Sequence, residues 1–410
     1  MPSSITWIDH DSAARERSLR ILALFQEKES RDELGLGGIR DSFADQLFPG
    51  TSTIQTRLRY MLFVPWIYKA LEDRRVSPGD FARRADTAER DLIDTMRNVD
   101  EREAGVFGGR SGRQLKRLPS SVYWAGLGSW GIRFADLSQD QYHRQIGVIY
   151  DRRKEQASRE RERSKIGDDL EKTPRRGTVT WHPRLPESPG QFPDEADFEL
   201  TQEEASFLLD RIQRSHPASL LAHVALHCEP ADVSAPWEHP DKAGFSPDHI
   251  ELLNHARIFS SVMHGAALVY NIVLAGAGGW TEKQEDHSEA LKYWVEDLDL
   301  AEVRDWSLVH FWKLTLGHGH TITPATRRFV ELWVSALVSH GESVGDDSST
   351  QELVRRREIS LKRSRSRFTN RRALDQWGGS SGLGRMTYRW HTASTFLEDL
   401  YAGLHQKGGA

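Results

Sequence analysis

The sequence predicts a mainly α-helical, multi-helical protein built in two parts. Apolar residues recur at spacings of three and four in most segments, whereas the strict alternation of apolar and polar residues that is typical of strands is scarce. Capping residues and prolines stand at the starts of several of these segments. With 410 residues, of which 38% are hydrophobic, the chain is too long for one small core, and we expect two or three domains.

The first predicted region spans residues 1–150. We expect helices over 11–30, over 39–50, from about 54 through the kink-prone Pro65, over 79–98 and over 122–130. After the last of these, Gly131 leads into the extended segment IRFA. A helix, a loop, a helix and a strand in this order are compatible with a winged-helix module, so we include one in the prediction.

The second predicted region spans 199–410 and follows a charged, proline-rich linker at 151–198. Residues 151–177 contain ten Lys/Arg and seven Asp/Glu with almost no apolar residue, and prolines follow. The region begins with a capping box at Thr201 and Glu204. Its longest helix is expected to start at Ser246-Pro247 and to stop at Gly276–Gly279. Further helices are expected over 306–316, 324–340 and 391–404.

The charge distribution carries the functional prediction. The chain has a formal net charge of -5, yet the segment 355–372, RRREISLKRSRSRFTNRR, holds nine Lys/Arg and one acidic residue, Glu358. Crowding like charges does not stabilise a fold, and arginine guanidinium groups bind phosphates with two parallel hydrogen bonds. The segment therefore predicts contact with a polyanion, although a solvated surface helix remains the alternative.

A second basic cluster, at residues 110–117, precedes the predicted winged-helix module, and Arg385 follows a glycine-rich loop. Basic clusters beside folded elements are typical of nucleic-acid-binding proteins. The predicted nucleic-acid contacts are Arg110, Arg113, Lys116, Arg117, Arg355, Arg356, Lys362, Arg363, Arg365, Arg367 and Arg385.

Several common chemistries lack their motifs. Cys228 is the single cysteine, which excludes an internal disulfide and Cys-rich zinc fingers. In GGSSGLGRM, Gly379 and Gly384 have the spacing of a phosphate-binding loop, but Arg385 stands where lysine is needed. His223 and His227 are four residues apart and could ligate zinc with a third group. We assign no catalytic residue and no cofactor.

The composition also suggests a location. The N-terminus lacks the charged and apolar regions of a signal peptide. The apolar stretch at 265–277 is shorter than the roughly 20 residues that span a bilayer. One cysteine fits a reducing compartment. We expect a cytoplasmic protein without a membrane partner.

The chain resembles an uncharacterised bacterial family, a domain of unknown function, along most of its length. The matching segments include RDELGLGGIRDSFADQLFPG, LKRLPSSVYWAGLGSWGI, HARIFSSVMHGAALVYN and WGGSSGLGRMTYRW. The resemblance implies no reaction and no catalytic residue. It does imply gene neighbourhoods with helicases and nucleases in bacterial defence islands.

Three hypotheses follow. In the first, the protein is a DNA-binding accessory component of an anti-phage defence system. In the second, it is a metal-dependent nuclease or other hydrolase whose site has no recognised motif. In the third, it is a scaffold that docks a helicase or nuclease partner through its basic segment.

Overall fold

The structure is a computed structural model, and it describes residues 32–99, 105–109, 111–166, 178–316 and 318–406. The mainly α-helical prediction is confirmed. Within these ranges the chain forms the α-helices α2 to α16, and the β pairing consists of one isolated bridge between Arg133 and Trp181. The helix expected over 11–30 lies outside the described residues.

The chain forms two compact units that differ from the two sequence regions we expected. Unit 1 combines the described parts of Phe48–Val233 and Arg389–Ala410, and unit 2 combines the described part of Ser18–Leu47 with Ser234–Tyr388. Each unit is therefore assembled from separated stretches of the chain. Residues 151–198, expected to be a linker, belong to unit 1 as far as the structure describes them.

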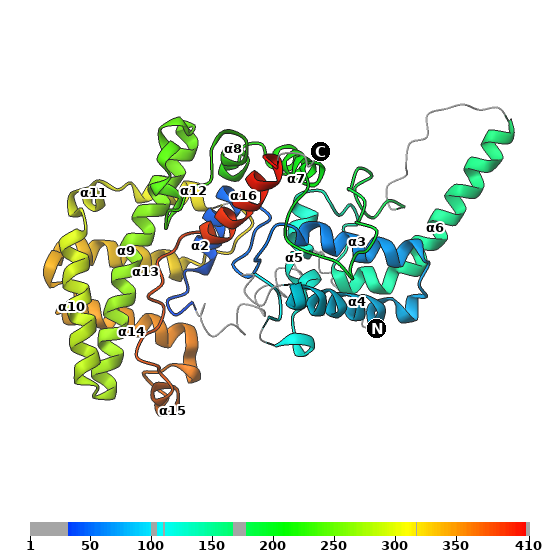
Figure 1. The fold of residues 1–410 in the computed structure, drawn as a ribbon. Helices are drawn as coiled ribbons and strands as arrows, with labels where there is room; N and C mark the ends of the chain where they lie inside the picture. Colours follow the sequence, from blue (N-terminus) through cyan, green and yellow to red (C-terminus); the bar gives the residue numbers. More distant parts are fainter. Residues whose placement is uncertain (1–31, 100–104, 110, 167–177, 317, 407–410) are drawn as a thin grey trace, which may run out of the picture. The chain divides into compact units, whose positions relative to one another are not determined.

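The described residues of unit 1 form seven α-helices, which Figure 1 labels, and one short 3-10 turn. They are α3 (Tyr60–Asp73), α4 (Pro78–Val99), η1 (Gly112–Gln114), α5 (Pro119–Ser129), α6 (Gln139–Ile166), α7 (Gln202–Ser215), α8 (Leu220–His227) and α16 (Trp390–Leu404). The capping box at the start of α7 is confirmed, since Thr201 and Glu204 exchange side-chain-to-backbone hydrogen bonds. Helix α6 extends over residues 151–166, and the charged residues of 151–161 lie mostly exposed on this helix rather than on a linker.

The core of unit 1 encloses a carboxylate that holds three segments together. Glu72 of α3, 3% exposed, accepts hydrogen bonds from the Thr180 hydroxyl (2.8 Å), the Trp181 indole (2.8 Å) and Tyr142 of α6. Burial raises the pKa of Glu72, and Arg153 acts in the opposite direction. With every oxygen partnered, this buried group serves as a structural link.

The winged-helix prediction is not confirmed. Helix α5 is present, but the segment after Gly131 makes only the bridge to Trp181, and no β-hairpin wing follows α5 among the residues that the structure describes. Instead, Arg133 folds back, and its guanidinium donates to the carbonyl of Leu137 at 2.9 Å. The residues we expected to form a strand therefore stabilise the connection between α5 and α6.

The central element of unit 2 is one long helix, α9 (Pro247–Gly278), against which other helices pack. Its other helices are α2 (Gly37–Leu47), α10 (Thr281–Asp297), α11 (Leu300–Asp305), α12 (Leu308–Thr315), α13 (Pro324–His340), α14 (Ser348–Lys362) and α15 (Arg371–Asp375). Short 3-10 turns lie at η2 (Pro236–Glu238), η3 (Pro240–Gly244), η4 (Gly341–Ser343) and η5 (Arg363–Arg365). Helices α2, α10, α13, α14 and α15 all pack against α9 (Figure 1).

Helix α9 confirms the prediction of a long central helix. Ser246 caps its start, where the hydroxyl accepts from the amide of His249, and Gly279 ends it in the left-handed region at φ 73°. At Gly265 the absent side chain admits Trp294 of α10, since a Cβ there would lie 2.2 Å from the indole. By length and composition α9 could span a membrane, but 83% of that stretch is buried within the fold, as in a core helix.

Candidate functional site

The basic segment 355–372 covers the second half of α14, the 3-10 turn η5 and the start of α15. Asp347 caps α14 by accepting from the amide of Thr350 at 2.8 Å. Hydrogen bonds from Ser349 and Thr350 lower the pKa of Asp347 to about 2. After Lys362 the helix stops at Arg363, whose φ of 51° turns the chain sharply. The segment thus changes direction in its middle, and its arginines have different environments.

Three of the nine cations point into unit 2, and the first is Arg357. It is 5% exposed, and its guanidinium donates to the carbonyl of Leu34 at 2.8 Å and to the hydroxyl of Thr326 at 2.8 Å. Burial lowers the pKa of Arg357. Because the guanidinium donates to these internal acceptors, Arg357 does not contribute to a phosphate-binding surface.

The other two of these cations, Lys362 and Arg367, are half-buried and share the carboxylate of Glu33. Arg367 lies 3.0 Å from Glu33 and also donates to the hydroxyl of Tyr270 at 2.8 Å, and Lys362 makes an ion pair with Glu33 as well. Glu33 is 4% exposed. Both residues were predicted phosphate contacts, and the structure pairs them with the buried carboxylate of Glu33.

Glu358, the one acidic residue of the segment, shapes the turn that follows it. It is 0% exposed and accepts from the amide of Arg367 at 3.0 Å and from the hydroxyl of Ser366. Lys362 lies 3.9 Å from the same carboxylate. These contacts of Glu358 hold residues 362–367 against the helix. The exposed arginines between them, Arg363 and Arg365, face solvent.

Two further arginines have carboxylate partners at the surface. Arg356 pairs with Glu352 at 2.7 Å and Arg371 pairs with Asp375 at 2.9 Å, each one helical turn away. Exposed pairs of this kind contribute about 0.3–0.5 kcal/mol and exchange readily with other anions. These pairs partly neutralise the positive charge of the surface, but an anionic ligand can still reach the arginines.

Four arginines of the segment are exposed and have no carboxylate partner within the described residues. They are Arg355, Arg363, Arg365 and Arg372, and we call this set the open arginines. The guanidinium of Arg355 lies 5.7 Å from the centre of the Phe368 ring, which leaves its hydrogen-bond donors unused. The open arginines are the part of the predicted cationic segment that the fold leaves for an external anion.

The first basic cluster, in unit 1, is more neutral than the sequence suggested. Arg110 lies outside the described residues. Arg113 is paired with Asp91 (3.1 Å) and Asp94 (2.5 Å) of α4, and those hydrogen bonds raise its pKa. Lys116 is exposed and Arg117 is half-buried. Lys116 and Arg117 stay predicted contacts, and Arg113 has two anionic partners.

The two candidate zinc ligands lie on α8. The ring centroids of His223 and His227 are 5.0 Å apart, as their spacing predicts. In the part of the chain that the structure describes, no third His, Cys, Asp or Glu comes within metal-binding distance of both. Two ligands alone do not form a protein zinc site.

A group that the sequence analysis missed contains Glu251, His255 and His310. Glu251 and His255 are one turn apart on α9, and their ligand atoms lie within 4.8 Å of one another and of His310 on α12. The Trp306 indole donates to Nδ1 of His255 at 2.8 Å, so the neutral ring carries its proton on Nε2. Both ring nitrogens are then occupied. We therefore do not assign a metal site to this group. His310 contacts the carboxylate of Glu251 at 3.2 Å, and His255 has a structural role.

The glycine-rich loop forms a strap along α9. The amide of Ser381 donates to the side chain of Asn271 at 2.8 Å, and Asn271 donates back to the Ser381 carbonyl at 2.8 Å. The carbonyl of Gly379 meets His287 at 2.7 Å, and the Tyr388 hydroxyl donates to the Ala256 carbonyl at 2.7 Å. These bonds hold the strap at both ends, and Arg385 projects from between them.

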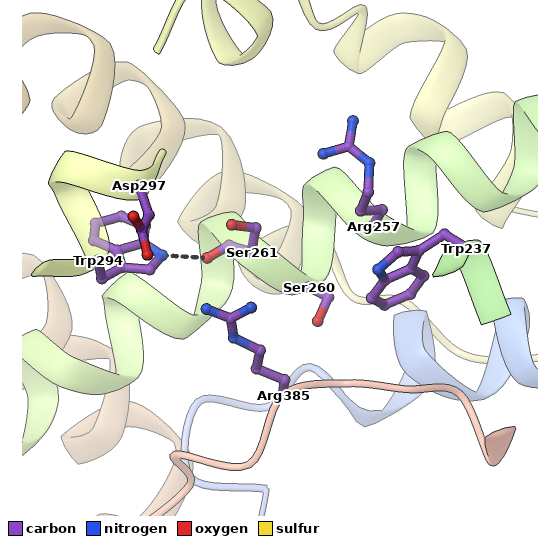
Figure 2. Close-up of a pocket in the computed structure, with 7 residues that line it drawn as sticks. All are labelled: Trp237, Arg257, Ser260, Ser261, Trp294, Asp297 and Arg385. Atoms are coloured by element: carbon purple, nitrogen blue, oxygen red, sulfur yellow. Dashed lines mark hydrogen bonds between the residues drawn. The ribbon is translucent and has the colours of Figure 1, made fainter. Parts of the chain in front are cut away.

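Arg385 lines a pocket of about 230 Å³ with residues from α9, α10 and η2. The other lining residues are Trp237, Arg257, Ser260, Ser261, Trp294 and Asp297, all in unit 2 (Figure 2). Trp294 is fixed by its indole, which donates to the Ser261 carbonyl at 3.0 Å, and Arg257 makes an ion pair with Glu302. Since these residues come from four separate stretches of the chain, no local sequence pattern could have revealed the pocket.

Comparison with known proteins places the chain among uncharacterised relatives. The sequence profile of a family of unknown function, DUF6361, matches residues 2–146 and 171–403. No curated protein and no solved structure matches the chain.

Proposed function

Given that the chain belongs to the DUF6361 family, whose function is unknown, we propose that it is a DNA-binding protein that contacts phosphates through the open arginines. One observation carries the proposal. Of the nine cations in 355–372, the fold buries Arg357, pairs Lys362 and Arg367 with the buried Glu33, pairs two at the surface, and leaves four exposed without a carboxylate among the described residues. These four are Arg355, Arg363, Arg365 and Arg372.

Physical chemistry favours an external anion at these four positions. Guanidinium groups at close spacing repel one another, and a phosphate chain relieves that repulsion while accepting paired N–H donors. Arg363 and Arg365 lie in one turn of η5, and the amide of Arg367 and the hydroxyl of Ser366 hold that turn against Glu358 (the Arg367 bond is 3.0 Å long). The arginines are therefore presented by a supported turn rather than by a loose chain.

The proposal includes fewer phosphate contacts than the sequence analysis predicted. The proposal leaves out Lys362 and Arg367, which pair with Glu33, and Arg113, which pairs with two aspartates. Lys116 and Arg117 remain candidate contacts in unit 1. Arg385 is assigned to the pocket discussed below. The winged-helix module is not part of the proposal.

The wider setting remains the anti-phage defence system that the family resemblance suggested. Its test is phage plating on cells with and without the gene. If the protein binds DNA but the gene does not change plating efficiency, the DNA-binding proposal holds and the proposed role in anti-phage defence is wrong.

The experiment uses two variants of equal charge change. In R363Q/R365Q two open arginines are lost, and in R356Q/R371Q two carboxylate-paired arginines of the same segment are lost. Fluorescence anisotropy with a labelled DNA duplex at low salt should show at least about tenfold weaker binding for the first variant. The second should lose less, because those arginines already have partners.

Three results would overturn the proposal. These are no measurable DNA affinity at low salt, equal losses in both variants, and a wild-type preference for a partner protein that survives nuclease treatment. The last would favour the scaffold hypothesis. An unlabelled RNA competitor tests whether the same surface prefers RNA.

A further inference from the structure

We infer that the pocket lined by Arg385 and Asp297 binds a small zwitterion, of the class of an α-amino acid with an apolar side chain. The inference does not rest on the proposed function, since the pocket and the open arginines share no residue. Four features of the pocket carry the argument.

The first feature is a pair of opposite charges that form no ion pair with each other. Arg385 and Asp297 are both exposed, and neither has an ion-pair partner among the described residues. Figure 2 shows the guanidinium of Arg385 and the carboxylate of Asp297 on opposite sides of the hydrogen bond between Trp294 and Ser261. Two separated, unpaired charges in one hollow fit a ligand that carries both a carboxylate and an ammonium group.

The second feature is the charge balance. The other guanidinium of the pocket, Arg257, is already paired with Glu302. With Arg385 balanced by Asp297, the formal charges sum to zero. A dianionic phosphate would leave this site negative, whereas a zwitterion keeps it neutral. The balance therefore favours an amino acid over a nucleotide or inorganic phosphate.

The third feature is an unused hydrogen-bonding group. Ser260 is 2% exposed, and its hydroxyl has no partner within the part of the chain that the structure describes. Buried polar groups are nearly always hydrogen-bonded. In Figure 2 the hydroxyl points into the space between Arg385 and Trp237. A ligand carboxylate held by Arg385 would supply the missing acceptor.

The fourth feature sets the size and character of the ligand. Trp237 is half-buried, and its indole offers an apolar face for a side chain. A volume of about 230 Å³ is below the roughly 300–1,000 Å³ of pockets that hold drug-sized molecules. One amino acid fits this space better than a peptide or a nucleotide.

The fold also holds in place, before binding, the backbone that carries Arg385 and the indole of Trp294. The strap that carries Arg385 is fixed by Asn271 on one side and by the Tyr388 hydroxyl on the other, and Trp294 is fixed by Ser261. Side chains that are ordered before binding reduce the entropy lost on association.

The test measures ligand binding to the full chain by thermal shift and calorimetry. Each proteinogenic L-amino acid is tried, together with the N-acetyl and amide derivatives of the best binder, and with GMP and inorganic phosphate. We expect at least one apolar amino acid to bind, and both derivatives to bind at least about tenfold more weakly, because each lacks one of the two charges.

Variants then connect binding to the pocket. R385Q, D297N and S260A should each weaken binding about tenfold, whereas R328Q and D305N, which change exposed residues outside the pocket, should not. S260A removes a hydroxyl that has no partner in the free protein, so the fold should tolerate it. The inference is overturned if no amino acid binds, if binding is indifferent to R385Q and D297N, or if GMP or phosphate binds through Arg385 while amino acids do not.

Discussion

The guanidinium of Arg367 lies 3.0 Å from the carboxylate of Glu33, inside unit 2, although the sequence presents Arg367 as part of an uninterrupted cationic segment. Glu33 also pairs with Lys362, and Glu358 lies 3.9 Å from the same lysine. These contacts divide the segment into a structural part and an open part. The division is the basis of the functional proposal.

The structural part makes a prediction about stability. Glu33→Gln removes a buried carboxylate that faces both Lys362 and Arg367 and leaves Lys362 with Glu358 alone, and breaking a buried pair typically costs about 3–5 kcal/mol. Urea denaturation should show a loss of this order. The control is Glu352→Gln, whose partner Arg356 is exposed, and we expect a change below about 0.5 kcal/mol. Similar losses in both variants would contradict the division.

A second prediction concerns the contact between α9 and α10. Gly265→Ala would place a methyl group 2.2 Å from the Trp294 ring. Because Trp294 is buried and its indole is bonded to Ser261, the helices would have to separate. We expect unit 2 to lose about 1–3 kcal/mol in its free energy of unfolding.

The matched control for this contact is Gly244→Ala. An added Cβ at Gly244 meets no atom within 4 Å. Thermal denaturation should therefore separate the two variants by several degrees. An unchanged melting temperature for Gly265→Ala would show that α10 is not held at this position.

A third prediction is a pH dependence that originates in unit 1. Glu89 is 1% exposed and accepts from the amide of Ser120 at 2.7 Å, and burial raises its pKa to about 7. The folded state therefore keeps a proton that the unfolded state loses from about pH 4.5 upward. Between these two pKa values stability falls as pH rises, by at most about 3 kcal/mol, and above pH 7 the contribution is constant.

Glu89→Gln isolates this effect. The difference in unfolding free energy between wild type and variant should change with pH between about 4.5 and 7, and should be flat above that range. Urea titrations at several pH values and constant ionic strength provide the measurement. A difference that grows in the opposite direction would show that Glu89 is ionised in the folded protein.

A fourth prediction tests the strap. Asn271 is 0% exposed and makes two hydrogen bonds of 2.8 Å with the backbone of Ser381. Asn271→Ala leaves those backbone groups unpaired and should release the strap. Trypsin should then cleave after Arg385 faster than in the wild type. Asn254→Ala, which changes an exposed residue of the same helix, should leave the cleavage rate unchanged.

Much of the fold could be predicted because its signals are local. The capping box at Thr201, the Ser246-Pro247 start of α9 and the Thr323-Pro324 start of α13 all act within one turn of helix, and the structure has each of them. The start of α3 was predicted wrongly. Thr51 donates its hydroxyl to the Phe48 carbonyl and the chain continues in turns, so the helix begins at Tyr60.

The environments of the charged residues could not be predicted, because their partners are distant in the sequence. Glu33 and Arg367 are separated by more than three hundred residues, and a count of charges treats every arginine as exposed. The pocket could not be predicted for the same reason, because Trp237 and Arg385 line it together only in the folded chain. Charge density in a sequence thus indicates a class of ligand, while the fold decides which side chains can reach it.

The most direct test of the central claim is the salt dependence of DNA binding. Each phosphate neutralised on a duplex contributes about −0.9 to the slope of log K against log salt, so four open arginines predict a slope of up to about −3.6. A variant with Gln at positions 355, 363, 365 and 372 should make that slope less steep by up to about 3.6. Equal slopes for wild type and variant would contradict the account.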